Sequence, residues 1–186
     1  MNTITFVTGG IRSGKSRFAL DLARQRFNGP KVFLATAQAL DEEMKRRIVN
    51  HQAERAGEFL TLEEPLYLSK AIKEAAQHAP LILIDCLTLW VNNLIYHFGQ
   101  DNLKIKNEIR LFMEVLEAKP SSIILVSNEI GWGIVGDNPL NRHFVDQLGA
   151  LNQEAAGLSD EVILMISGIP QILKECENHA KLDRSF

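Results

Sequence analysis

Residues 9–16 read Gly9-Gly10-Ile11-Arg12-Ser13-Gly14-Lys15-Ser16 and match the pattern G-x4-G-K-[ST]. An apolar, β-branched run from Ile4 to Thr8 precedes this stretch, and a helical pattern from Lys15 to Phe27 follows it. Glycines let such a loop turn tightly around a phosphate, while its N–H groups, the helix N-terminus and Lys15 supply positive charge. The stretch therefore predicts a P-loop that binds a nucleotide, with Ser16 as a ligand of Mg²⁺. The alternative is a glycine-rich turn that binds nothing.

Short apolar runs alternate with helical patterns along the rest of the chain. Further strands are expected at Lys31 to Thr36, Phe59 to Leu62, Leu81 to Asp85, Ser122 to Ser127, and Glu161 to Ser167. Helices are expected at Leu40 to Ala56, Pro65 to Gln77, Leu87 to His97, Leu103 to Ala118, and Asn138 to Leu158. This alternation predicts an α/β chain, a P-loop NTPase (RecA-like) three-layer fold with a mostly parallel central sheet. Because Leu81 to Ile84 and Ile123 to Val126 are continuously apolar, these two strands belong in mid-sheet.

Length, composition and charge exclude several classes of protein. The 186 residues fit a single nucleotide-binding domain, 1–186, and the hydrophobic fraction of 46% is that of an ordinary globular chain. With 20 Lys plus Arg against 23 Asp plus Glu, the net charge is −3 and no basic block favours nucleic acid as a partner. Cys86 and Cys176 lack the spacing of a zinc site or a disulfide framework. Without a signal peptide or an apolar run long enough for a membrane span, we expect a soluble cytoplasmic protein.

Asp85 closes the apolar run Leu81 to Ile84, which is where the second acid of a P-loop enzyme stands. A carboxylate at that strand end would lie beside the P-loop and hold magnesium through water. The alternative is an Asp that caps the next helix. Given the P-loop, we predict that Asp85 belongs to the metal site.

Three basic side chains stack at helical spacing in the segment from Leu40 to Ala56. Arg47, His51 and Arg55 stand at i, i+4 and i+8, so an imidazole is flanked by two guanidinium groups. Such neighbours favour the neutral imidazole, which can act as a nucleophile, and they could also hold a polyphosphate. The alternative is that His51 edges the core beside the apolar stripe Leu40, Met44 and Ile48.

The stretch from Asn128 to Gly136 follows a central strand at its carboxyl end, where open α/β sheets bind ligands. It combines a carboxylate, Glu129, with Trp132 and three glycines. A large flat substrate could lie there. Equally, the loop could be mobile, with Trp132 as its hydrophobic anchor.

Several of these segments together resemble the bifunctional adenosylcobinamide kinase / adenosylcobinamide-phosphate guanylyltransferase family of cobalamin biosynthesis. The resemblance rests on Gly9 to Arg17, Ala35-Thr36-Ala37-Gln38, Asp41 to Met44, Arg47-Ile48-Val49-Asn50-His51, and Ser127 to Val135. It extends to Ser167-Gly168-Ile169-Pro170 and so covers nearly the whole chain. Some family members carry Glu at the position of Asp85 and Ala at that of Ile11, and both differences leave the chemistry intact.

The resemblance implies two reactions at one nucleotide site. In the first, the aminopropanol hydroxyl of adenosylcobinamide is phosphorylated. In the second, a histidine attacks the α-phosphate of GTP, expels pyrophosphate, and passes GMP to adenosylcobinamide phosphate. By motif position this histidine is His51, and GTP, ATP and Mg²⁺ are the implied nucleotides and metal.

Carried over by position, the nucleotide site comprises residues from five segments. These are Gly9, Gly10, Ile11, Arg12, Ser13, Gly14, Lys15 and Ser16; Ala35, Thr36 and Ala37; His51, Gln52, Ala53 and Glu54; Glu63; and Asp85. Glu64 could replace Glu63 as the matching carboxylate, or both could cap the helix expected at Pro65. The family further implies a homotrimer with the corrinoid held between subunits.

Two other functions compete with this one. A different P-loop small-molecule kinase would transfer only the γ-phosphate and would use His51 structurally. A regulatory GTP switch is disfavoured because the chain has no N-K-x-D motif for guanine.

Overall fold

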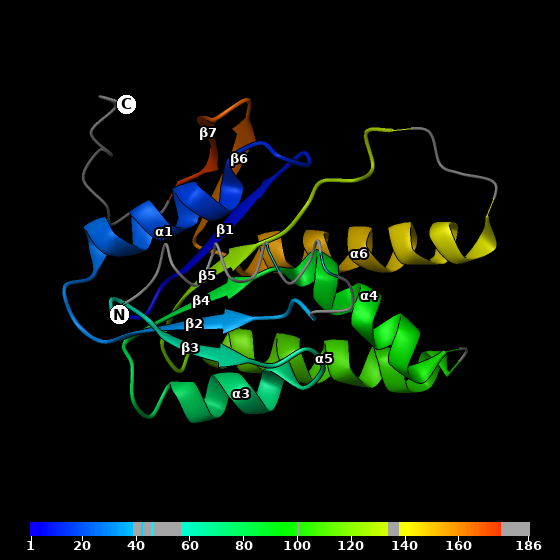
Figure 1. Ribbon diagram of the computed structural model, residues 1–186, viewed down its shortest axis with the longest axis horizontal. Coiled ribbons are helices and arrows are strands. Elements are labelled where there is room, and N and C mark those ends of the chain that lie inside the picture. The colour runs from blue at the N-terminus through cyan, green and yellow to red at the C-terminus, as the bar shows by residue number, and fades with distance from the viewer. Residues whose placement is uncertain (39–41, 43–45, 47–56, 100, 134–137, 176–186) are drawn as a thin grey trace.

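A computed structural model describes residues 1–38, 42, 46, 57–99, 101–133 and 138–175 of the chain. Its centre is a sheet of seven strands (Figure 1). In chain order these are β1 (Ile4–Gly9), β2 (Lys31–Ala35), β3 (Leu60–Glu63), β4 (Leu81–Asp85), β5 (Ser122–Val126), β6 (Glu161–Ile166) and β7 (Ile169–Lys174).

The strands lie in the order β3-β2-β4-β5-β1-β6-β7. All neighbours pair in parallel except β6 and β7, which form an antiparallel hairpin. The carboxyl ends of the six parallel strands therefore share one edge of the sheet. In this register Ala35 lies between Glu63 and Asp85, and Asp85 in turn lies opposite Val126.

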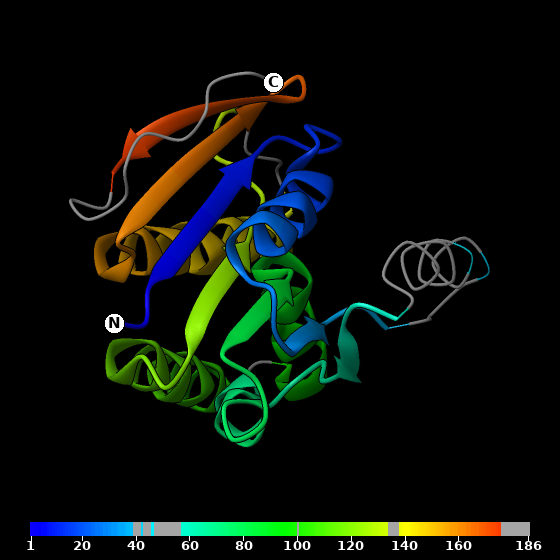
Figure 2. The same cartoon turned by 90° about the vertical axis from the view of Figure 1, so that its left-hand side faces the viewer.

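Helices cover the two faces of the sheet unequally. Those that lie wholly within the described residues are α1 (Lys15–Arg26), α3 (Leu68–Ala75), α4 (Leu87–Phe98), α5 (Asn102–Ala118) and α6 (Pro139–Leu158). Figure 2 shows α1 on one side of the sheet and α3 to α6 on the other. The result is the three-layer arrangement that the sequence predicts.

Strand β4 shows why its sequence does not alternate between apolar and polar residues. Leu81 and Leu83 pack in the cluster under α1, whereas Ile82 and Ile84 pack in the cluster under α3 to α6. All four side chains are fully buried. A strand covered on both faces needs apolar residues at every position, which confirms the expected mid-sheet place of β4 and β5.

An ion pair anchors the C-terminal end of α1. The Arg26 guanidinium makes two hydrogen bonds with Glu161 of β6, of 2.7 and 3.0 Å, and a third of 3.2 Å with the Thr5 hydroxyl. Glu161 is almost fully buried, so this bidentate contact satisfies a carboxylate that water hardly reaches. It fixes the direction in which α1 leaves the P-loop.

The expected elements agree with the structure to within a few residues, with two exceptions. Strand β7 was not expected. Helix α3 begins at Leu68 rather than Pro65, because a turn held by the Glu64 side chain occupies the residues before it. The helix expected at Leu40 to Ala56 lies largely outside the described residues. None of the described helices combines the length and apolarity that a membrane crossing requires.

Candidate active site

The P-loop connects β1 to α1 at the carboxyl edge of the sheet, as its sequence predicts. Gly14 is the N-cap of α1 and has a φ of 93°, in the left-handed region that favours glycine. No described side chain caps the helix, so the amides of its first turn remain available to an anion. Lys15 and Ser16 are the first two residues of α1, which places both against the loop.

Lys15 is buried beneath its own loop. Its Nζ donates hydrogen bonds to the Gly10 carbonyl, 2.6 Å away, and to the Ser13 hydroxyl, 3.4 Å away. Burial lowers the pKa of Lys15, while the nearby Asp85 carboxylate acts in the opposite direction. The fold therefore brings Lys15, the first residue of α1, close to Asp85, the last residue of β4.

Backbone contacts hold the P-loop against the strands on both sides of β1. The Glu129 amide, just after β5, donates to the Gly9 carbonyl at 3.0 Å. On the other side the Gly168 amide, in the β6–β7 turn, donates to the Ser13 carbonyl, also at 3.0 Å. The loop is thereby shaped before any phosphate binds.

A threonine side chain extends the pairing of β2 and β4 beyond the strand ends. The Thr36 hydroxyl donates to the Cys86 carbonyl at 2.8 Å and accepts from the Cys86 amide at 2.7 Å. Asn93 of α4 donates to the Thr36 carbonyl at 2.8 Å. Burial raises the pKa of the Cys86 thiol to about 12, so this thiol is neutral. These contacts fix Ala35 to Ala37 beside Asp85.

A cluster of buried polar side chains holds the start of the loop after β5. The Ser127 hydroxyl donates to Asn152 of α6 at 2.7 Å, and Asn152 donates to the Asn128 carbonyl at 3.0 Å. The Asn128 amide donates to the hydroxyl of Thr88, in α4, at 2.8 Å. Thr88, Ser127 and Asn152 are all buried. Thr88, Asn93 and Asn152 were not among the expected site residues; their signal in the sequence is a polar residue on the apolar face of a helix.

The structure separates the two adjacent carboxylates of the β3 end. Glu64 accepts hydrogen bonds from the amides of Leu66 and Tyr67, both at 2.9 Å. Glu63 is the last residue of β3 and its side chain is exposed at the carboxyl edge. Glu64 therefore has a structural role before α3, and Glu63 lies next to Ala35 at the carboxyl edge of the sheet.

The fold brings four of the five predicted segments to one edge: residues 9–16, 35–37, Glu63 and Asp85. His51, Gln52, Ala53 and Glu54, together with Arg47 and Arg55, lie outside the described residues. Trp132 is 72% exposed, so it does not anchor its loop to the core. An exposed indole at this edge suits the flat-substrate interpretation better than the anchor interpretation.

The chemistry of the donor set suits magnesium held through a substrate. Ser16 and Asp85 offer a hydroxyl and a carboxylate, the oxygen ligands that Mg²⁺ prefers. Across the described part of the chain, no three His, Cys, Asp or Glu side chains gather into a cluster that could hold a metal. Mg²⁺ in phosphoryl-transfer enzymes uses few protein ligands plus phosphate oxygens, and this set fits that pattern.

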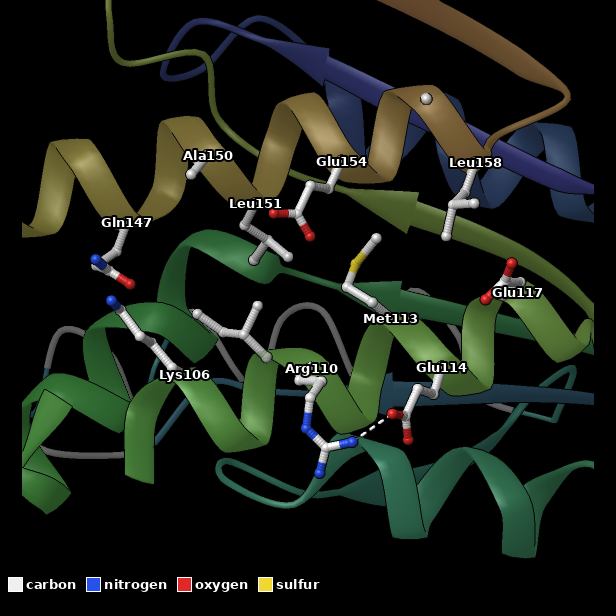
Figure 3. Close-up of a pocket in the computed structure, with 12 residues that line it drawn as sticks. Lys106, Arg110, Met113, Glu114, Glu117, Gln147, Ala150, Leu151, Glu154 and Leu158 are labelled. Carbon is white, nitrogen blue, oxygen red and sulfur yellow. Dashed lines mark hydrogen bonds and ion pairs between the residues drawn. The ribbon is translucent and has the colours of Figure 1, made fainter. Parts of the chain in front are cut away.

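A cavity of about 700 Å³ lies away from this edge, between α5 and α6 (Figure 3). Met113, Leu151 and Leu158 form apolar parts of its wall, and the ion pair of Arg110 with Glu114 lies at its rim. None of the described residues that line it belongs to the P-loop or to a strand. It is therefore separate from the nucleotide site.

Comparison with solved structures identifies the fold. The chain superposes on a KaiC-like protein from Pyrococcus horikoshii with a TM-score of 0.55 and 16% identity, over 96% of this chain and 82% of that one. It superposes on the flagellar accessory protein FlaH from Methanocaldococcus jannaschii with a TM-score of 0.50 and 14% identity, over 93% and 78% of the two chains. At such identities the likeness shows the fold alone, which is that of the P-loop NTPases.

Sequence comparison gives closer relatives. A Pseudomonas aeruginosa protein named bifunctional adenosylcobalamin biosynthesis protein CobP is 43% identical over 169 residues, covering 90% of this chain and 95% of its own. Proteins named bifunctional adenosylcobalamin biosynthesis protein CobU from Salmonella typhimurium and Escherichia coli are 38% and 36% identical, each covering 88% of this chain and 95% of their own. Residues 5–173 match the family described as cobinamide kinase / cobinamide phosphate guanyltransferase. The chain belongs to this family and is a P-loop transferase of cobalamin biosynthesis with kinase and guanylyltransferase activities.

Proposed function

We propose that both activities use the P-loop as their common phosphate site and that guanylyl transfer passes through His51. The observation that carries the proposal is the meeting of Lys15, Asp85 and the Ala35–Ala37 wall at one edge of the sheet. In each reaction the β- and γ-phosphates of the nucleotide lie on the loop amides and Lys15. Ser16 and Asp85 would hold Mg²⁺, which when bound neutralises charge on the phosphate oxygens.

In the kinase step the hydroxyl of adenosylcobinamide attacks the γ-phosphorus of ATP or GTP. The bond from that phosphorus to the β–γ bridging oxygen breaks, and the nucleoside diphosphate leaves with the electron pair. Lys15 and the loop amides stabilise the charge on the transferred group and the leaving group. In this step the protein itself forms no covalent bond with the substrate.

In the guanylyl step an imidazole nitrogen of His51 attacks the α-phosphorus of GTP. The bond to the α–β bridging oxygen breaks and pyrophosphate leaves, so the P-loop holds the leaving group. Adenosylcobinamide phosphate then takes GMP from the histidine, giving adenosylcobinamide-GDP. In this step the guanosine contacts Ala35 to Ala37, Gln52 to Glu54 and Glu63. We favour Glu63 over Glu64 because the Glu64 side chain already accepts hydrogen bonds in the turn before α3.

The decisive experiment uses α-labelled GTP and magnesium. Wild-type protein should keep the label after denaturation, in an acid-labile and base-stable bond as expected of a phosphoramidate. His51→Ala should bind GTP but keep no label. If neither protein is labelled although GTP binds, the covalent step through His51 is wrong, and GMP must pass directly from GTP to the acceptor.

We further propose a single cytoplasmic domain over residues 1–186 that assembles as a homotrimer with the corrinoid between subunits. Support comes from the family resemblance and from the absence of zinc-type or disulfide-type cysteine spacing. Light scattering on the purified protein tests the assembly: a mass of one or two chains would contradict it.

A further inference from the structure

A second cavity, of about 400 Å³, adjoins the P-loop on the side away from β2. Gly14, the N-cap of α1, belongs to both the P-loop and the wall of this cavity. The other lining residues come from α1 and the β6–β7 hairpin: Arg17, Phe18, Asp21, Leu22, Gln25, Met165, Gly168 and Pro170. The views in Figures 1 and 2 both place α1 next to this hairpin, in line with the hydrogen bond from Gly168 to Ser13.

The sheet order sets this cavity apart from the proposed guanosine wall. From β1, which leads into the P-loop, β2 lies three strands away in one direction, and β6 is the next strand in the other. Ala35 and Met165 thus stand four strand spacings apart, roughly 19 Å at about 4.8 Å per spacing. A single nucleobase cannot contact both places.

The two reactions need the nucleotide to present different phosphorus atoms. Guanylyl transfer exposes the α-phosphorus to His51 and leaves the β- and γ-phosphates on the P-loop. Kinase transfer exposes the γ-phosphorus to an acceptor and requires the nucleoside to lie clear of that acceptor. If both triphosphates rest on the same loop amides, the nucleoside can leave the loop toward β2 in one reaction and toward β6 in the other.

We propose that the cavity beside α1 binds the purine base of the nucleoside triphosphate that donates its γ-phosphate. This inference rests on the proposed function, which assigns the guanosine of the covalent step to the Ala35–Ala37 wall. The kinase nucleotide then runs from the P-loop past Gly14 into the cavity, and its γ-phosphate faces Asp85 and the acceptor. One phosphate site serves two base sites.

The lining of the cavity suits a purine. Phe18, Leu22 and Pro170 supply apolar surface for the faces of a flat ring system. Arg17, Asp21 and Gln25 follow one another at intervals of four residues along α1 and supply polar groups for its edge. Asp21 also pairs with Arg24, with 3.0 Å between Oδ1 and Nη1.

The proposal can be tested by placing a larger side chain in the cavity at Pro170 of β7, with the neighbouring Gln171 as the control position. Pro170 lines it, whereas the next residue, Gln171, is exposed and points to the opposite face of the strand. Pro170→Trp should raise the KM for the γ-phosphate donor and lower kcat/KM of the kinase step by about 10-fold or more. Labelling with α-labelled GTP should change by less than about 2-fold, and Gln171→Trp should change neither reaction.

Two further measurements keep the test decisive if Pro170→Trp folds poorly. An azido-purine nucleoside triphosphate should crosslink wild-type protein to the peptides of Arg17 to Gln25 or Met165 to Pro170. ATP should protect those peptides under kinase conditions. Equal loss of both reactions in a folded Pro170→Trp protein, an unchanged kinase step, or crosslinks confined to Ala35 to Ala37 would each overturn the proposal. Failure of the proposed function differs, because it appears as missing labelling or missing kinase turnover in the wild type.

Discussion

The carbonyl oxygen of Met165 occupies the space that a Cβ atom on Gly9 would need. Gly9 ends β1 and Met165 lies opposite it in β6, so the contact joins the first residue of the P-loop to the sheet. The Ser13 hydroxyl also lies 2.9 Å from the same Cβ position. The first glycine of the motif is therefore required by the protein's own packing as well as by the phosphate.

Gly9→Ala should therefore destabilise the protein even without nucleotide. The backbone of β6 must move to admit the methyl group, at a cost of about 2 to 3 kcal/mol. Gly149→Ala is the control, because Gly149 lies in α6 with open space around its Cβ position, and it should be neutral or slightly stabilising. Urea unfolding of the nucleotide-free proteins measures both. Equal stability of Gly9→Ala and wild type would contradict the steric argument.

Replacing Asn152 with leucine tests the polar cluster behind the loop after β5. Leucine has nearly the same shape but leaves the Ser127 hydroxyl and the Asn128 carbonyl each short of a partner. With about 1 to 2 kcal/mol for each buried group, we expect a loss of about 2 to 4 kcal/mol in the free energy of unfolding. The exposed neighbour, Gln153→Leu, should stay within about 0.5 kcal/mol of wild type. Denaturant titration of the two variants decides between a specific cluster and general sensitivity of α6.

Lys15→Met should separate stability from ligand binding. Because burial disfavours the charged amine, as the lowered pKa of Lys15 shows, methionine should leave the nucleotide-free protein at least as stable as wild type. Saturating GTP with magnesium should stabilise wild type by about 3 kcal/mol at a hundredfold excess over Kd, and the variant far less. Thermal unfolding with and without GTP shows this, with Lys73→Met on the exposed side of α3 as the control. Equal stabilisation of Lys15→Met by GTP would exclude Lys15 from the phosphate site.

Asp160, just before β6, should give the protein a pH-dependent contribution to stability. Burial alone would raise its pKa, but Lys119, at 2.6 and 2.8 Å, and the Ile4 amide, at 2.7 Å, outweigh burial and lower it. A carboxyl with a depressed folded pKa stabilises fully above its unfolded value of about 3.9 and loses that effect as the pH falls through the folded pKa. Asp160→Asn should therefore cost about 1 to 2 kcal/mol at pH 7, and the difference from wild type should shrink below about pH 4.

Asp146→Asn, at an exposed position of α6, is the control for Asp160 and should follow the wild-type pH profile. Chemical unfolding at pH 7, 5 and 3 measures the three proteins. A difference between wild type and Asp160→Asn that grows toward acid would reverse the assigned sign.

The central strands could be predicted from the sequence because apolar residues are required on both of their faces. The run Leu81 to Ile84 is apolar at every position because α1 covers one face and the larger helical layer covers the other, and this predicted a central strand. Its place in the sheet then put Asp85 at the edge that holds the P-loop. Local pattern and parallel topology together were enough to assemble most of the site.

Strand β7 was missed because its pattern is weak. Proline at Pro170 argues against a central strand, yet it is tolerated here at the edge of the sheet. Ser167 and Gly168 both have positive φ, 50° and 85°, as a tight hairpin turn requires, so the Ser-Gly pair was the available signal.

The hydrogen bonds of the buried polar side chains could not be predicted from the sequence for a different reason. Asn93 and Asn152 each look like an interruption in an apolar helical stripe. Their partners, Thr36 and Asn128, lie 57 and 24 residues away, so the hydrogen bonds exist only once the sheet has formed.

The packing of Gly9 between Met165 and the Glu129 amide also bears on how the chain is made. The P-loop is translated among the first residues, but its supports at Glu129, Met165 and Gly168 emerge from the ribosome more than 110 residues later. A nascent chain that ends before β6 lacks the contacts from Met165 and Gly168, so we expect nucleotide to stabilise the early folding intermediates less than the complete protein. We therefore expect chains truncated before Met165 to gain little stability from nucleotide, and to depend on chaperones or be degraded.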